Sequence, residues 1–219
     1  MTTLKSGVAG ARLIDGPAGK LEVVLHDGNE RGPFSKDDYY AVIAHPHPLY
    51  GGTMDNKVVT TLARIYRELG IAVARFNFRG VGASEGNHDN GDGEVQDLLA
   101  AAKHLQSGCS GSRLLIAGYS FGAAVAAAAS VEALPAHLLL VAPPVGRYPF
   151  APEGAFPCPV LMVLGDRDDL VDAQQAQHWA RALCSPAECR VIAGADHFFD
   201  GNLKDLTESV APVLSMSLR

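Results

Sequence analysis

The stretch RLLIAGYSFGAAVAAAAS, residues 113–130, decides the fold. It begins with a short apolar run typical of a buried strand and ends in an alanine-rich run typical of a helix. Between the two lies Gly118-Tyr119-Ser120-Phe121-Gly122, a G-x-S-x-G pattern whose glycines allow a tight turn that raises the serine above a sheet. This order of strand, turn and helix predicts that Ser120 is a nucleophile. The alternative is a glycine-bounded turn with an inactive serine.

A serine nucleophile requires a base, because a hydroxyl group reacts poorly until its proton is removed. After a motif of this kind the base lies near the C-terminus and follows the acid in the chain. His197 fits, since it follows the last predicted strand in a glycine-containing loop, residues 193–199. A structural loop histidine is the alternative. The other histidines fit less well, because His104 and His178 fall in predicted helices while His26 and His88 precede the nucleophile.

The acid is expected just after the strand that precedes the histidine's strand, where Leu164-Gly165-Asp166-Arg167-Asp168-Asp169 lies. Three aspartates compete there, namely Asp166, Asp168 and Asp169, and their positions alone leave the choice open. Asp172 is assigned a structural role instead. It precedes a predicted helix and has a glutamine three residues later, which is the pattern of an N-cap.

Two backbone N–H groups are expected to stabilise an oxyanion. One belongs to Phe121, the residue after the nucleophile, and the other to the loop that follows the strand at residues 41–44. That loop reads His45-Pro46-His47-Pro48, and because proline has no N–H, the backbone amide of His47 is the nearest donor. A metal site built on the His-x-His pair is the alternative, but no third ligand follows at close spacing. We therefore predict no metal and no cofactor.

The rest of the chain indicates one α/β domain covering residues 1–219, with a mainly parallel sheet of about eight strands and helices on both faces. A hairpin of residues 11–14 and 21–25 is expected to open the sheet. The other predicted strands are 41–44, 71–76, 114–117, 138–141, 160–164 and 190–192, all expected to be buried on both faces. The predicted helices are 57–69, 94–106, 121–131, 173–183 and 203–216. The proline-rich segment 142–159 is expected to be a loop.

The chain resembles the α/β-hydrolase superfamily, particularly its small bacterial carboxylesterases and dienelactone-hydrolase-like members without a lid. The resemblance rests on the loop from His45 through Gly51-Gly52-Thr53-Met54-Asp55-Asn56-Lys57, on Phe78-Arg79-Gly80-Val81-Gly82-Ala83-Ser84-Glu85-Gly86, on the turn at Ser120, and on residues 165–168 and 194–197. It implies an α/β-hydrolase fold with no lid domain. It also implies that the acid is the last residue of G-x-x-D, which is Asp168, completing a triad with Ser120 and His197. Dienelactone hydrolases proper carry a cysteine in place of this serine.

This resemblance and the motifs predict a carboxylesterase-type serine hydrolase that cleaves small carboxylic esters through an acyl-enzyme. Short acyl groups are favoured because only the segment 142–159 is available to cover the site, with Tyr148, Phe150 or Phe156 as possible wall residues. A thioesterase, a lactonase or a hydrolase of small amides or peptides would use the same residues. A catalytically silent scaffold with this fold is the alternative from another class.

Composition sets limits on partners. The net charge is -6 and no basic run occurs, so we expect neither nucleic acid nor a membrane surface as a partner, but a small-molecule ester. Four cysteines, Cys109, Cys158, Cys184 and Cys189, form no CxxC pair and are expected to be free thiols. Without a signal-peptide core or a long apolar run, a cytoplasmic location is expected. Oligomeric state is not readable from the sequence.

Overall fold

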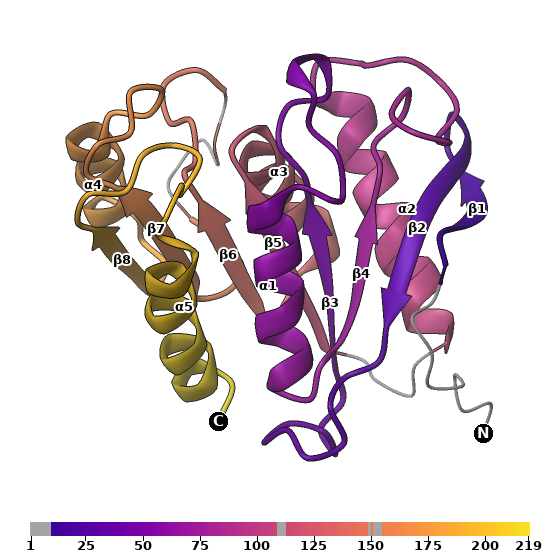
Figure 1. Ribbon diagram of the computed structural model, residues 1–219, viewed down its shortest axis with the longest axis horizontal. Helices are drawn as coiled ribbons and strands as arrows, with labels where there is room; N and C mark the ends of the chain where they lie inside the picture. The colour runs from indigo at the N-terminus through magenta and orange to yellow at the C-terminus, as the bar shows by residue number, and fades with distance from the viewer. Residues whose placement is uncertain (1–9, 109–112, 149, 151–154) are drawn as a thin grey trace.

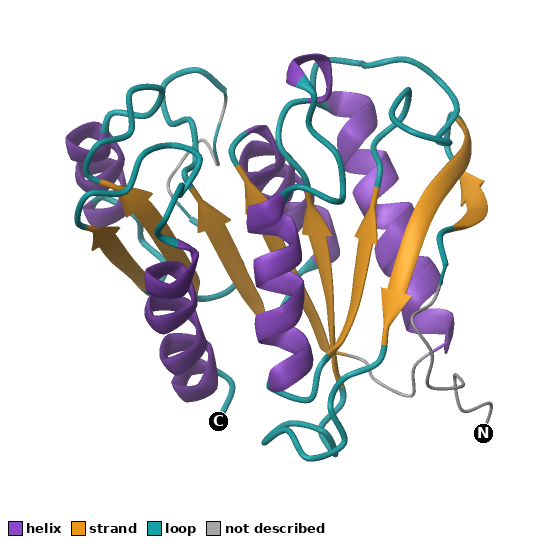
Figure 2. Cartoon of the chain, viewed as in Figure 1, coloured by secondary structure: helices purple, strands orange, loops and turns teal. Residues whose placement is uncertain are grey.

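A computed structural model describes residues 10–108, 113–148, 150 and 155–219, and these form an eight-stranded sheet covered by helices (Figures 1 and 2). The strands are β1 (Arg12–Gly16), β2 (Gly19–His26), β3 (Tyr39–Ala44), β4 (Ala72–Phe76), β5 (Arg113–Tyr119), β6 (His137–Val141), β7 (Val160–Gly165) and β8 (Ala187–Ile192). The helices are α1 (Lys57–Glu68), α2 (Asp92–Gly108), α3 (Phe121–Ala133), α4 (Ala173–Arg181) and α5 (Leu203–Ser217), with a 3-10 turn η1 (Pro48–Tyr50).

The strand order is β1-β2-β4-β3-β5-β6-β7-β8. The hairpin β1–β2 is antiparallel and β2 also pairs antiparallel with β4, whereas the pairs from β4 to β8 are parallel. The predicted opening hairpin and the mainly parallel sheet are therefore confirmed. Because β3, β5, β7 and β8 run the same way, their carboxyl ends lie at one edge of the sheet, and the loops that leave them can meet there.

Helices cover both faces of the sheet. Helices α1 and α5 lie together on one face and α2 and α3 lie on the other (Figure 1). Strand β5 shows why both faces are needed: Leu115 and Ala117 point into the core under α1 and α5, while Leu114 and Ile116 point into the core under α2 and α3. A strand with apolar side chains on both faces of the sheet must be covered by helices on both faces.

One expectation about burial is wrong. Strand β8 was expected to be buried on both faces, but it is the edge strand, paired only with β7, and Val191 in it is 40% exposed. Its residues Glu188 and Arg190 form an ion pair at this edge. Charged side chains protect an edge strand from pairing with other chains, which accounts for its polar composition.

Other expectations concern loops and thiols. In segment 142–159 the described residues form no helix, as predicted. The thiols of Cys158 and Cys189 are free, as expected, and Cys109 lies outside the described residues. None of the helices that the structure describes is long and apolar enough to cross a bilayer.

Candidate active site

Ser120 occupies a strained turn between β5 and α3. Its backbone has φ 54° and ψ -121°, a conformation that costs a non-glycine residue about 1–3 kcal/mol. The flanking glycines make the turn possible, because a Cβ on Gly118 would lie 2.0 Å from the carbonyl oxygen of Gly122. The Ser120 amide is held by the carbonyl of Val141 at 2.9 Å. The side chain does not cap α3, so its hydroxyl is available for another partner.

The structure brings Ser120, His197 and Asp168 together in one hydrogen-bonded chain. Nε2 of His197 lies 3.0 Å from Oγ of Ser120, and Nδ1 of His197 lies 2.8 Å from Oδ2 of Asp168. The His197 residue is 6% exposed and the Asp168 side chain is 1% exposed. This geometry fixes the imidazole so that its Nδ1–H faces the carboxylate and its Nε2 lone pair faces the hydroxyl.

The loop after β7 distinguishes the competing aspartates. Oδ1 of Asp168 accepts hydrogen bonds from the amides of Leu170 and Val171, both at 2.8 Å, which turns Oδ2 toward the histidine. Asp166 instead accepts the amide of Gly194 at 2.6 Å and so ties the β7 loop to the histidine loop. Asp169 is exposed.

Asp172 caps α4, as predicted. Its Oδ1 accepts the amides of Gln174 at 2.8 Å and Gln175 at 3.0 Å.

A hollow of about 420 Å³ lies beside Asp168. It is lined by Val145, Gly146, Arg147, Asp168, Asp169, Leu170, Asp172 and Gln175.

Phe121 and His47 lie side by side at the start of α3, with ring centroids 4.8 Å apart. Gly122 allows this approach, because a Cβ there would lie 2.4 Å from the carbonyl oxygen of Ala44 and 2.5 Å from that of His45. Among the residues that the structure describes, neither the Phe121 amide nor the His47 amide donates to a backbone or side-chain acceptor. Both N–H groups are free to bind a ligand oxygen.

His45 and His47 face different surroundings. His45 is fully buried, donates from Nδ1 to the carbonyl of Pro46 at 2.6 Å, and accepts the amide of Phe78 on Nε2 at 3.0 Å. Burial lowers the pKa of His45 to about 4, so the ring stays neutral and links the loop after β3 to the loop after β4. The ring of His47 accepts the amide of Leu49 on Nδ1, and burial followed by the nearby His88 lowers its pKa.

Two features of the site were not predicted from the sequence. The phenol of Tyr119, the residue before the serine, is buried and donates to the carbonyl oxygen of His197 at 2.9 Å, which positions the histidine loop. Burial raises the pKa of Tyr119, so the phenol keeps its proton. The second feature is the loop after β4, where His88 packs against His47 and Phe121.

The expected wall residues separate into two groups. Tyr148 packs edge-on against Phe121, with ring centroids 5.4 Å apart, and so lies beside the turn at Ser120. Phe150 and Phe156 pack against Trp179 of α4 instead, at 5.1 and 5.9 Å. Of the three, only Tyr148 touches a residue next to the serine among the ring contacts of the described residues.

Residues 39–211 match the family described as Alpha/beta hydrolase domain. An alpha-beta serine hydrolase homologue from Coxiella burnetii is 42% identical, with a TM-score of 0.89 over 95% of this chain and 99% of that one. A serine hydrolase without a lid from Xanthomonas campestris is 37% identical, with a TM-score of 0.81 over 93% and 92% of the two chains. An uncharacterised protein of Rickettsia prowazekii is 35% identical over 90% of this chain and 84% of its own length.

Proposed function

The chain belongs to the α/β hydrolase family, and within it we propose that this hydrolase cleaves small carboxylic esters through an acyl-enzyme on Ser120. The observation that carries the proposal is the chain of contacts from Ser120 Oγ to His197 Nε2 and from His197 Nδ1 to Asp168. A neutral imidazole in this position can take the serine proton, and a buried carboxylate behind it stabilises the imidazolium that forms.

In the first half of the proposed reaction, Oγ of Ser120 attacks the ester carbonyl carbon while its proton moves to Nε2 of His197. The carbonyl oxygen becomes an oxyanion and is bound by the free amides of Phe121 and His47. The imidazolium then gives its proton to the alcohol oxygen, the bond from that oxygen to the carbonyl carbon breaks, and the alcohol leaves. Water repeats the sequence on the acyl-enzyme and releases the acid.

The proposed preference for short acyl groups follows from what surrounds the serine. Ser120 is half-buried, and among ring contacts of the described residues Tyr148 alone of the proline-rich segment reaches the neighbouring Phe121. A long acyl chain gains its binding energy from a deep apolar channel. The hollow beside Asp168 is instead lined largely by polar residues, including Asp169 and Arg147.

Labelling with a fluorophosphonate probe tests the nucleophile. We expect one adduct on the wild-type protein and none on Ser120→Ala, whose turnover of p-nitrophenyl butyrate should fall by at least about four orders of magnitude. The matched control is Ser217→Ala, which changes an exposed serine of α5 and should label normally. Labelling that persists in Ser120→Ala would contradict the proposal. Esters of increasing chain length test the acyl preference, which is wrong if turnover rises beyond about eight carbons.

A further inference from the structure

Glu94, in the first turn of α2, is a fully buried carboxylate that holds the loop before it. Oε1 accepts the amide of Asp89 at 2.9 Å and Oε2 accepts the amide of Gly91 at 2.8 Å. Burial alone would raise the pKa of Glu94, but these amides, and then His88, outweigh it and lower the pKa, so the group is ionised. Nδ1 of His88 is enclosed and lies 2.8 Å from Oε1, outside the geometry of a hydrogen bond.

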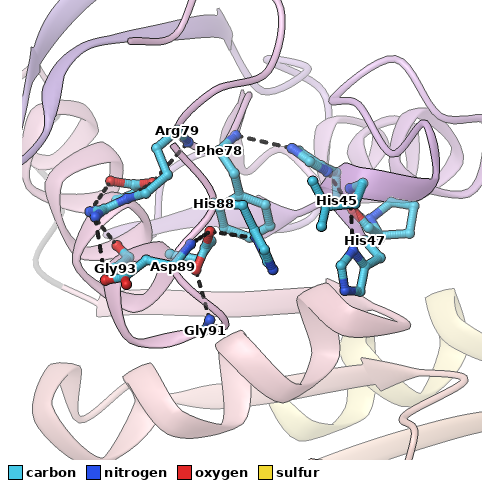
Figure 3. A network of polar contacts seen from close by, with 12 residues as sticks. His45, His47, Phe78, Arg79, His88, Asp89, Gly91 and Gly93 are labelled. Carbon is cyan, nitrogen blue, oxygen red and sulfur yellow. Dashed lines mark hydrogen bonds and ion pairs between the residues drawn. The ribbon is translucent and has the colours of Figure 1, made fainter. Parts of the chain in front are cut away.

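A second buried carboxylate, Asp97 of α2, also holds the loop after β4. Asp97 is fully buried and binds Arg79 through both oxygens, at 2.8 and 3.0 Å, and Arg79 also donates to the carbonyl of Gly93 at 2.7 Å (Figure 3). The result is a rigid support for His88. Its ring lies 4.9 Å from that of His47 and 5.6 Å from that of Phe121, centroid to centroid.

The two ring nitrogens of His88 have different surroundings. Nδ1 carries the proton, since a lone pair there would face a carboxylate oxygen 2.8 Å away. Nε2 has no hydrogen-bond partner among the described residues, although the side chain is only 11% exposed. Nε2 of His88 is therefore open to a ligand beside His47 and Phe121, the two residues whose amides are proposed to bind the oxyanion.

The acyl group is the part of the substrate that we expect beside His88. The leaving alcohol must lie at Nε2 of His197, because the histidine gives it a proton. We place His88 on the acyl side of the serine, because its ring packs against the two residues whose amides are proposed to bind the oxyanion. A hydroxyl group suits Nε2 of His88 in either charge state, because it donates to the neutral ring and accepts from the imidazolium.

We propose that His88 is a specificity residue that binds a hydroxyl group on the acyl part of the substrate, so that esters of small hydroxy acids are preferred over unsubstituted acids of the same shape. This proposal rests on the proposed function of Ser120. Tyr148 also packs against Phe121, so its hydroxyl group is a rival partner and the test must separate the two.

Two isosteric pairs of ethyl esters isolate the hydroxyl group: lactate with isobutyrate, and 3-hydroxybutyrate with isovalerate. Acid release measured at constant pH gives kcat/KM for each ester. The ratio of hydroxy ester to apolar ester, corrected for the rates with hydroxide, is the readout. We expect the corrected ratio to exceed about threefold in at least one pair, the range that one uncharged hydrogen bond gives.

Variants of His88 then assign the preference. In His88→Phe and His88→Asn the ratio should fall to about one, while His88→Gln should keep part of it, because a glutamine amide reaches the place of Nε2 and an asparagine amide does not. Control variants are Tyr148→Phe and, on the exposed surface of α4, His178→Phe, and neither should remove the preference.

Three outcomes would overturn the proposal: a ratio near one in the wild type, a ratio that survives in all His88 variants, or one that disappears only in Tyr148→Phe. The second outcome, with equal losses for both esters of a pair, would show that His88 merely supports the oxyanion loop. Fluorophosphonate labelling of every variant keeps this test separate from the proposed function. A labelled Ser120 with no hydroxyl preference rejects the role of His88 alone.

Discussion

Adding one methyl group at Gly122 should damage the proposed oxyanion site while leaving the serine, the histidine and the acid in place. The new Cβ of Gly122→Ala would stand 2.4 Å from the carbonyl oxygen of Ala44 and 2.5 Å from that of His45. These are backbone atoms at the end of a central strand, so no side chain can turn away to relieve the clash. Real Cβ contacts begin at 3.0 Å, so α3 and the loop after β3 must separate by at least about 0.6 Å.

A shift of that size matters because catalytic groups must hold their geometry to about 0.5 Å, and an error of about 1 Å costs about a hundredfold in rate. We expect kcat for p-nitrophenyl butyrate to fall about 10- to 100-fold in Gly122→Ala, and the free energy of unfolding to fall by about 1–3 kcal/mol.

Steady-state kinetics at a temperature where the variant is fully folded measure kcat, and urea unfolding measures the free energy. Gly108→Ala is the control, because a Cβ at that exposed helix end meets nothing within 4 Å. A kcat within about twofold of wild type, in a folded and destabilised variant, would refute the link between this close approach and the oxyanion amides.

Two further predictions concern buried polar groups. Tyr119→Phe leaves the carbonyl of His197 without its hydrogen-bond donor, so we expect the free energy of unfolding, measured in urea, to fall by about 1–3 kcal/mol and kcat to fall with it. An unchanged free energy of unfolding would contradict the positioning role. His137 is buried, and among the described residues its Nδ1 has no hydrogen-bond partner; burial lowers the pKa of His137 from 6.5 to about 4. Below pH 6.5 the unfolded chain takes up this proton and the folded chain does not, so stability falls as the pH drops to about 4, by up to about 3 kcal/mol for this residue. His137→Leu should reduce that fall in unfolding measured from pH 7 to pH 4, and an equally steep fall in the variant would count against it.

The sheet, Ser120 and His197 were accessible from sequence because local patterns encode them, whereas Asp168 followed from the family resemblance. A strand buried on both faces has a continuous apolar run, and the turn at Ser120 requires glycines at fixed positions, so each signal lies within a few residues. Spacing alone did not separate Asp166 from Asp168. Their roles differ because Oδ1 of Asp168 is engaged by two amides of its own loop, whereas Asp166 reaches across to Gly194. That difference depends on three-dimensional loop geometry.

The parts that sequence missed depend on contacts between distant segments. The bond from Tyr119 to the His197 carbonyl joins residues 78 apart in the chain, and no periodicity marks it. Residues 88–94 are mostly polar in sequence, yet Glu94 among them is fully buried. Burial here follows from packing of α2 against the sheet and α3, which brings the start of the helix beneath the loop. Edge strand β8 was misjudged for a related reason, since only the order of strands determines which one lies at the edge.

The buried charges of α2 are difficult to explain by stability alone. Moving a carboxylate out of water costs several kcal/mol, and a buried ion pair often recovers no more than an apolar pair of the same volume would. Asp97 and Glu94 both bear this cost, and most of their partners belong to the loop after β4 or the turn that starts α2. What the arrangement gains is a fixed position for residues 88–91, where Asn90 and Gly91 adopt positive φ angles of 54° and 115°. A loop held so firmly beside two free backbone amides is better suited to orienting a substrate than to filling a core. The cost of burying these carboxylates is therefore most simply explained by the position it gives to His88.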